Sequence, residues 1–128
     1  MEKIKSYTDI EQSKKLAEIL PLESADMAYC AIHNIGQKLY HCNVPIFAYA
    51  SNKDVPCWSL AALLKLLPQK IEHEGNEAEL HINSRMTDLW YENDNFIYFG
   101  TFAEKLIDAC VQLICTLNEK GLLWTEKK

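Results

Sequence analysis

Hydrophobic and polar positions in the last third of the chain, residues 80 to 123, follow the periods of regular secondary structure. Residues 78–84, 86–92 and 95–100 are rich in β-branched and aromatic types, and they predict three strands. Asn93-Asp94 predicts a hairpin turn between the last two strands, because both residue types tolerate positive φ.

An amphipathic helix is predicted after these strands and ends near Lys120. Thr101 and Glu104 have the spacing of a capping box at its start, and Gly121 suits the left-handed residue that follows a helix. The apolar stripe of this helix recurs every three to four residues and consists of Leu106, Ala109, Cys110, Leu113, Ile114 and Leu117.

Two further helices are predicted in the first half of the chain. Thr8 and Glu11 form a capping-box pattern ahead of a helix at residues 9–20, which Pro21 ends. Ser59 is a candidate N-cap for a second helix at residues 60–67, stopped by Pro68. The second helix is apolar on nearly all sides, so we expect it to be buried or to face a partner.

The segment from residue 24 to residue 50 is ambiguous. Residues 24–36 fit either a helix capped by Ser24 and closed near Gly36, or a buried strand. We favour the strand, because another early helix would leave the later strands poorly covered. Residues 38–42 and 45–50 are predicted to be extended, and residues 51–54 form a turn cluster.

Together these elements predict an α+β fold, with an antiparallel sheet of four to five strands and two to three helices packed mainly on one face. The chain has 128 residues, of which 48% are hydrophobic, and only four Gly and four Pro. We therefore expect one domain over residues 1–128 and no long linker.

Charge argues against nucleic-acid binding. The formal net charge is −5, and Arg85 is the only arginine among 13 basic residues. Seven acidic residues between Glu72 and Asp94 predict a solvated face, or alternatively a docking face for a basic partner or a cation. The charged start of the chain and the lack of a long apolar run predict a cytoplasmic protein without membrane contact.

Candidate chemistry is sparse. Cys30, His33, His41 and Cys42 are the nearest approach to a metal set, but adjacent residues of a strand point to opposite faces. Cys57, just ahead of the Ser59 cap, is the best-placed thiol for nucleophilic chemistry, although no histidine is near in sequence. The odd count of five cysteines argues against a disulfide framework. We therefore predict no catalytic residue and no cofactor.

A protein-interaction role is the stronger hypothesis. Trp58 precedes a helix cap and is typical of a hydrophobic staple; alternatively, with Tyr49 and Trp90, it lines a groove for a peptide or subunit. Leu60 and Leu64 on the apolar helix are further interaction candidates. We expect a non-enzymatic accessory protein that binds a protein partner or forms a homo-oligomer. The alternatives are a small cysteine- or metal-dependent enzyme and an acidic decoy of a nucleic-acid-binding protein.

Residues 56–68, Pro-Cys-Trp-Ser-Leu-Ala-Ala-Leu-Leu-Lys-Leu-Leu-Pro, resemble a segment of small uncharacterised proteins from gut bacteria and their prophages or mobile elements. The resemblance extends over the predicted hairpin and Asp108-Ala109-Cys110-Val111, and would cover residues 20–123. It implies an accessory, phage-associated protein of unknown function, with no catalytic residues to transfer.

Overall fold

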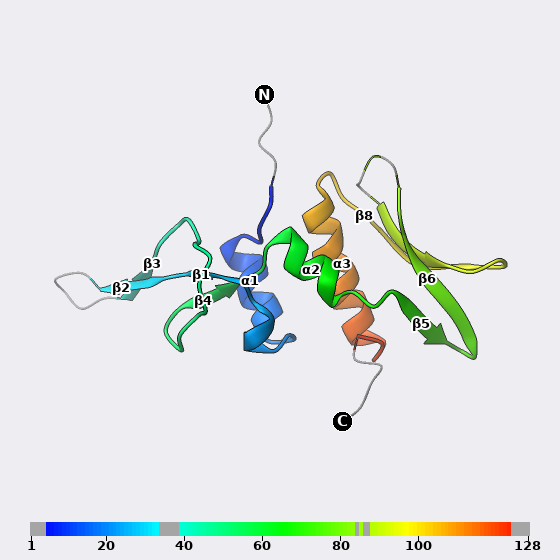
Figure 1. Ribbon diagram of the computed structural model, residues 1–128, viewed down its shortest axis with the longest axis horizontal. Helices are drawn as coiled ribbons and strands as arrows, with labels where there is room; N and C mark the ends of the chain where they lie inside the picture. The colour runs from blue at the N-terminus through cyan, green and yellow to red at the C-terminus, as the bar shows by residue number, and fades with distance from the viewer. Residues whose placement is uncertain (1–4, 34–38, 84, 86–87, 124–128) are drawn as a thin grey trace. The chain divides into compact units, whose positions relative to one another are not determined.

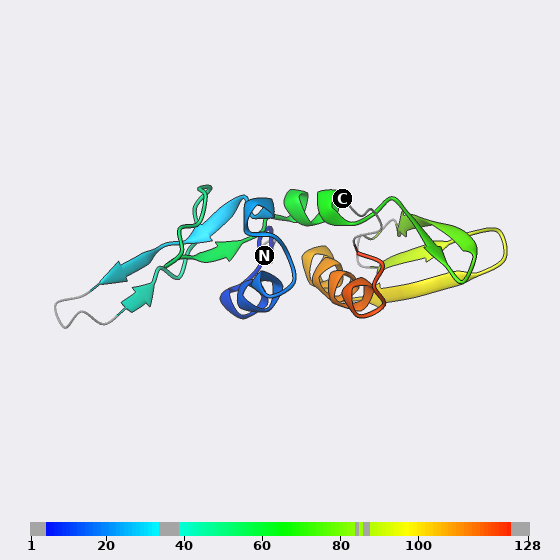
Figure 2. The same cartoon turned by 90° about the horizontal axis from the view of Figure 1, so that it is seen from below.

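The computed structural model describes residues 5–33, 39–83, 85 and 88–123, and the chain divides into two compact units. The N-terminal unit is Ser6–Ala62, and the C-terminal unit combines Met1–Lys5 with Leu63–Lys128 (Figures 1 and 2). The expectation of one domain over residues 1–128 stays a prediction, because the presence of two compact units does not show that each unit folds on its own. Expected features at residues 36, 38, 84, 86 and 87 lie outside the described residues.

Helix α1 (Ile10–Ala17) opens the N-terminal unit. Its N-cap is Asp9, whose Oδ1 accepts from the Gln12 amide at 2.7 Å, while Gln12 Oε1 accepts from the Asp9 amide at 3.1 Å. This capping box lies one residue later than the predicted Thr8–Glu11 pair. The predicted pair is wrong, because the Thr8 hydroxyl is buried and does not cap the helix.

Four short strands follow the 3₁₀ turn η1 (Leu22–Ser24): β1 (Met27–Tyr29), β2 (Ala31–His33), β3 (Leu39–His41) and β4 (Val55–Cys57). β1 pairs antiparallel with β4, and β2 with β3, so the strand interpretation of residues 24–36 is confirmed for 27–29 and 31–33.

The predicted strand at residues 45–50 is wrong. Only Ile46 pairs, through an isolated bridge to Ala28 with N–H···O distances of 2.8 and 3.0 Å, and the remainder is bend and coil. The turn at residues 51–54 is confirmed by the bond from the Asp54 amide to the Ser51 carbonyl at 3.1 Å.

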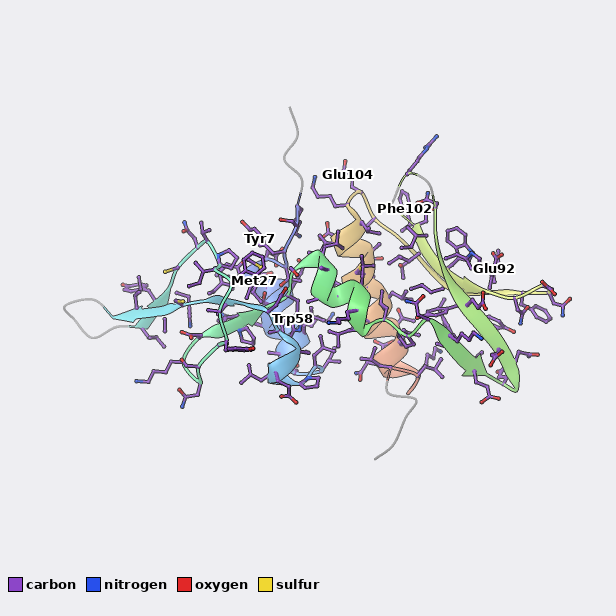
Figure 3. All side chains as sticks on the ribbon, in the orientation of Figure 1. Tyr7, Met27, Trp58, Glu92, Phe102 and Glu104 are labelled. Atoms are coloured by element: carbon purple, nitrogen blue, oxygen red, sulfur yellow. The ribbon has the colours of Figure 1, made fainter. Side chains whose placement is uncertain are left out.

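The core of the N-terminal unit lies between α1 and the β1–β4 pair. Met27, Tyr29, Val55 and Cys57 are buried there, and the partly buried Tyr7 and Ile10 pack against them. Figure 3 shows Tyr7, Met27 and Trp58 gathered around this helix.

Helix α2 (Leu60–Leu66) begins as predicted, because Ser59 Oγ accepts from the Ala62 amide at 3.2 Å. The boundary between the two units falls within this helix. Leu63 is buried, whereas Leu60 and Leu64 are half-buried.

The C-terminal unit contains a four-stranded antiparallel sheet in the order β5-β6-β7-β8. Three strands match the prediction: β6 (Asn76–Ile82), β7 (Asp88–Glu92) and β8 (Ile97–Phe102). The edge strand β5 (Lys70–His73) was not predicted. The His73 ring lies 4.9 Å from the Phe99 ring, so side chains of the two edge strands meet.

The turns of this sheet use two different devices. Glu74 and Gly75 join β5 to β6 with φ values of 53° and 82°, as a type I′ turn requires. The β7–β8 hairpin is instead held by Asn93, whose Oδ1 accepts from the Asn95 and Phe96 amides at 2.8 and 2.9 Å. Its predicted location is confirmed, and neither Asn93 nor Asp94 has a positive φ.

A β-bulge interrupts β8. Leu89 pairs with Thr101 and Tyr91 with Tyr98, so Trp90 faces both Phe99 and Gly100. Phe99 adopts a φ of 55°, a conformation that glycine usually supplies.

Helix α3 (Leu106–Glu119) packs against β7 and β8 and forms the core of the C-terminal unit. The predicted Thr101–Glu104 cap is wrong, because Thr101 is in β8 and the N-cap is Lys105. The glycine stop is confirmed: Gly121 has a φ of 72°, and the Leu122 amide donates to the Leu117 carbonyl at 2.9 Å. The predicted α+β class is thus confirmed.

Candidate functional site

The β2–β3 hairpin presents apolar side chains on one face. Ile32 and Tyr40 are directly opposite each other and are 50% and 44% exposed. Opposed residues of an antiparallel pair project to the same face of the sheet, so these two side chains are neighbours on the surface.

Residues 44–49 add a second group of exposed apolar side chains. Phe47 is 75% and Tyr49 is 88% exposed, and Val44 and Ile46 are more than half exposed. Both backbone hydrogen bonds between Ile46 and Ala28 hold this segment against β1. We use the name N-terminal apolar surface for the exposed side chains of both groups taken together: Ile32, Tyr40, Val44, Ile46, Phe47 and Tyr49.

Five of these six side chains belong to a segment that carries no ionic charge. Residues 39–50 contain no Asp, Glu, Lys or Arg, and His41 is their only basic side chain. Large exposed apolar groups without surrounding charge are typical of protein-interaction surfaces. The absence of ionic residues from 39 to 50 was the sequence feature that could have indicated this surface. The apolar content of residues 45–50 instead suggested a strand that pairs within a sheet.

The five predicted interaction residues do not share one surface. Tyr49 lies on the N-terminal apolar surface, whereas Trp58 is fully buried and its indole N–H donates to Ser24 Oγ at 3.0 Å. Trp90, in the C-terminal unit, stacks on His81 and donates to Glu92 Oε1 at 2.7 Å. Trp58 is therefore part of the core, as a staple-like role would require.

Cys57 lies in an environment that keeps its thiol protonated. It is fully buried, its Sγ donates to the Thr8 carbonyl at 3.4 Å, and burial raises its pKa. Hydrogen bonds to Thr8 and Ser13 oppose this shift without reversing it. A protonated buried thiol is a poor nucleophile, so the geometry gives no support to cysteine catalysis here.

The Cys30, His33, His41 and Cys42 set is divided by the strand register. Continuing the pairing of Ala31 with His41 places Cys30 opposite Cys42, on the face opposite to that of His41. His41 Nε2 lies 2.9 Å from the Lys53 carbonyl, and His33 occupies the position opposite Leu39. Among the described residues, no group of three or more His, Cys, Asp or Glu side chains is arranged to hold a metal ion.

The outer face of the C-terminal sheet is acidic. Glu72 is directly opposite Glu77, and Glu79 is directly opposite Glu92, and opposed like charges destabilise a strand pair. A shallow pocket of about 370 Å³ lies on this face; Glu92 is labelled in Figure 3. Its lining residues are Glu77, Ala78, Glu79, His81, Glu92, Asn93 and Asp94.

No protein-family model matches the chain, and no curated protein and no solved structure matches it. The resemblance to phage-associated proteins therefore stays a prediction. Within the described ranges, every helix is too short or too polar to cross a bilayer.

Proposed function

We propose that this protein is a non-enzymatic accessory protein that self-associates through its N-terminal apolar surface. One observation carries the proposal: Phe47 and Tyr49 are three-quarters or more exposed, on a segment that backbone hydrogen bonds hold in place. Removing such side chains from water would supply the free energy of association.

The charge distribution favours a second copy of this chain as the partner that covers the N-terminal apolar surface. The chain has a net charge of −5, and contacts between most parts of two copies would bring like charges together. Residues 39–50 are free of ionic charge, so two copies can meet there in a self-complementary, two-fold contact without that repulsion.

The test is the molar mass of the full chain, measured by sedimentation equilibrium over a range of protein and salt concentrations. We expect a monomer–dimer equilibrium that raised salt does not weaken, because apolar contacts are not screened. The double variant Phe47→Ser/Tyr49→Ser is expected to be monomeric at concentrations where the unchanged protein is a dimer.

A matched control separates this surface from general stickiness. Phe102 is 72% exposed but lies in the C-terminal unit, so Phe102→Ser removes the same chemistry elsewhere (Figure 3). We expect it to leave the dimer intact. A protein that stays monomeric up to millimolar concentration, or equal weakening by both variants, would refute the proposal.

A second candidate function is supported by the opposed glutamates of the C-terminal sheet. Surplus negative charge on a concave face suits a basic partner, as an acidic decoy of a nucleic-acid-binding protein would need. Glu77→Gln/Glu79→Gln should then weaken binding of an oligo-lysine peptide, while Glu119→Gln on α3 should not. Binding that is absent, or insensitive to salt, would exclude this function.

The proposal includes a cytoplasmic location and a prophage-derived origin. Fractionation of cells expressing the chain tests the location.

A further inference from the structure

Two cysteines face each other at the base of the β2–β3 hairpin. The register that pairs Ala31 with His41 places Cys30 opposite Cys42 when it is extended by one residue. The Cys42 amide donates to the Cys30 carbonyl at 2.9 Å, which fixes this opposition in the backbone. The two side chains therefore leave the same face of the hairpin.

Strand geometry brings these residues within disulfide range. Opposed residues of an antiparallel pair have Cα atoms about 4.5 to 5.5 Å apart. Disulfides span Cα separations of about 4.4 to 6.8 Å. Opposed Cβ atoms are about 4.5 to 5.5 Å apart and a disulfide holds them at about 3.5 to 4.5 Å, so bond formation needs rotation of the side chains about χ1 and a slight approach of the two strands.

Exposure distinguishes this pair from the other cysteines. Cys30 and Cys42 are both partly exposed, whereas Cys57 and Cys110 are fully buried. Burial raises the pKa of Cys110 to about 12, so its reactive thiolate is suppressed. Cys115 is partly exposed but lies on α3, in the C-terminal unit.

We propose that Cys30 and Cys42 form a dithiol site that reacts with small disulfides of the glutathione class and closes into an intramolecular disulfide. One thiolate attacks a sulfur of the small disulfide, which forms a mixed disulfide and releases one small thiol. The second thiolate then attacks the protein sulfur of that bond and releases the other small thiol. Two protein thiols lose two hydrogen atoms, and the small disulfide gains them.

The product ties β2 to β3 and closes residues 30–42 into a loop. The bond joins partly exposed residues on two strands that must approach slightly to form it, so we expect it to be labile and readily reversed by excess thiol. The inference does not depend on self-association, because the register alone carries it.

The test uses the full chain, first reduced and then equilibrated with reduced and oxidised glutathione at set ratios. Remaining thiols are alkylated, and the peptides are mapped by mass spectrometry. We expect alkylated thiols to fall from five to three, with a Cys30–Cys42 linked peptide and almost no retained glutathione.

Single variants supply the controls. Cys30→Ser and Cys42→Ser cannot resolve the mixed disulfide, so each should retain about tenfold more glutathione than the unchanged chain, because the partner thiol acts at high effective concentration. Cys115→Ser should behave like the unchanged chain. Repeating the reaction on Phe47→Ser/Tyr49→Ser excludes a requirement for self-association. Retained glutathione on the unchanged chain, a link to another cysteine or a bond between two chains would overturn the proposal.

Phenylarsine oxide provides a second measurement that needs no oxidant, because it bridges two adjacent thiols. We expect one equivalent to protect Cys30 and Cys42 together from alkylation. Protection of neither cysteine would count against the site even if the serine variants folded poorly.

Discussion

The two units of this protein distribute polar and apolar groups in opposite ways. In the N-terminal unit, the hydroxyls of Thr8 and Ser13 are fully buried and lie 2.7 Å apart, while Phe47 and Tyr49 are exposed. In the C-terminal unit, Leu113 and its neighbours on α3 are buried, while glutamates cover the outer face of the sheet.

The difference shows how strand length limits burial. Each strand of the N-terminal unit has three residues, too few to cover the apolar side chains on both faces. The C-terminal unit places a 14-residue helix over a four-stranded sheet, and the apolar stripe of that helix is buried. In the N-terminal unit, hydrogen bonds that link Thr8 to several segments offset this limited burial of apolar side chains.

The contacts of Thr8 extend to four residues in three segments of the chain. Its hydroxyl accepts from the Trp58 amide at 3.2 Å, and its carbonyl accepts from the Tyr29 hydroxyl at 2.8 Å. The same hydroxyl contacts Ser13 Oγ and Cys57 Sγ. The N-terminal unit is thus organised around a buried polar residue, whereas the C-terminal unit is organised around an apolar helix.

The largest expected effect tests the apolar core. Leu113→Ala should lower the free energy of unfolding by about 2–5 kcal/mol, because it leaves a cavity beneath α3. Gln112→Ala, at an exposed position one residue earlier, should change it by less than about 0.5 kcal/mol. Urea titration measures both, and a loss below about 1 kcal/mol for Leu113→Ala would contradict tight packing here.

Thr8→Val tests the polar centre of the N-terminal unit. The variant keeps the shape but leaves the Trp58 amide and the Ser13 hydroxyl without this partner, so we expect a loss of about 1–3 kcal/mol. Thr8→Ser retains the hydroxyl and should be milder. Equal losses for the two variants, measured by urea titration, would show that the methyl group matters and the hydrogen bonds do not.

Alkaline pH should weaken both units. Burial raises the pKa of Tyr29 in one unit and of Tyr91 and Cys110 in the other, so the folded state keeps protons that the unfolded state releases. For Cys110, the contribution of this raised pKa to the free energy of unfolding is fully present below pH 9.0 and is lost as the pH rises towards about 12. Each group contributes a slope of up to about 1.4 kcal/mol per pH unit within its window.

Thermal unfolding between pH 7 and pH 11 measures this slope. Cys110→Ala should flatten the part that begins near pH 9, whatever its effect at pH 7. A slope unchanged by that substitution would show that the Cys110 thiol does not contribute.

The smallest expected effect compares two glycines of the C-terminal unit. Gly121→Ala should cost about 1 kcal/mol, because its φ of 72° is unfavourable for a residue with a Cβ. A Cβ at Gly100 would lie 3.7 Å from the Trp90 Cβ, an ordinary contact, so Gly100→Ala should be nearly neutral. The reverse order in thermal midpoints would place the strain in the bulge and not at the helix end.

Prediction from the sequence was most accurate where one period of apolar residues continued long enough to exclude other kinds of secondary structure. The stripe of α3 and the glycine after it were predicted, but the helix start was not, because Thr101 suits a helix cap and a strand equally well. Strand β5 was missed because Ile71 is its only strongly apolar residue. Strand β4 was missed because it contains Pro56, a residue that usually argues against a strand.

The candidate site was only partly predictable for a related reason. Tyr49 was named as an interaction residue, but Phe47 and Ile46 were assigned to a strand, because local composition cannot show whether a partner strand exists. Trp58 was named because it precedes the Ser59 cap, and it is fully buried, with its amide bonded to the Thr8 hydroxyl. Pairing between Cys30 and Cys42 required the hairpin register, which the sequence did not supply.

The bulge at Phe99 and Gly100 has a consequence for behaviour at high concentration. β8 is an edge of its sheet, and Ile97 and Phe102 on it are 70% and 72% exposed, a combination that invites amyloid-like stacking of chains. The extra residue divides the strand into two short stretches and increases its twist. A strand of another chain therefore finds no long, regular edge to pair with, and the bulge disfavours continued stacking of chains.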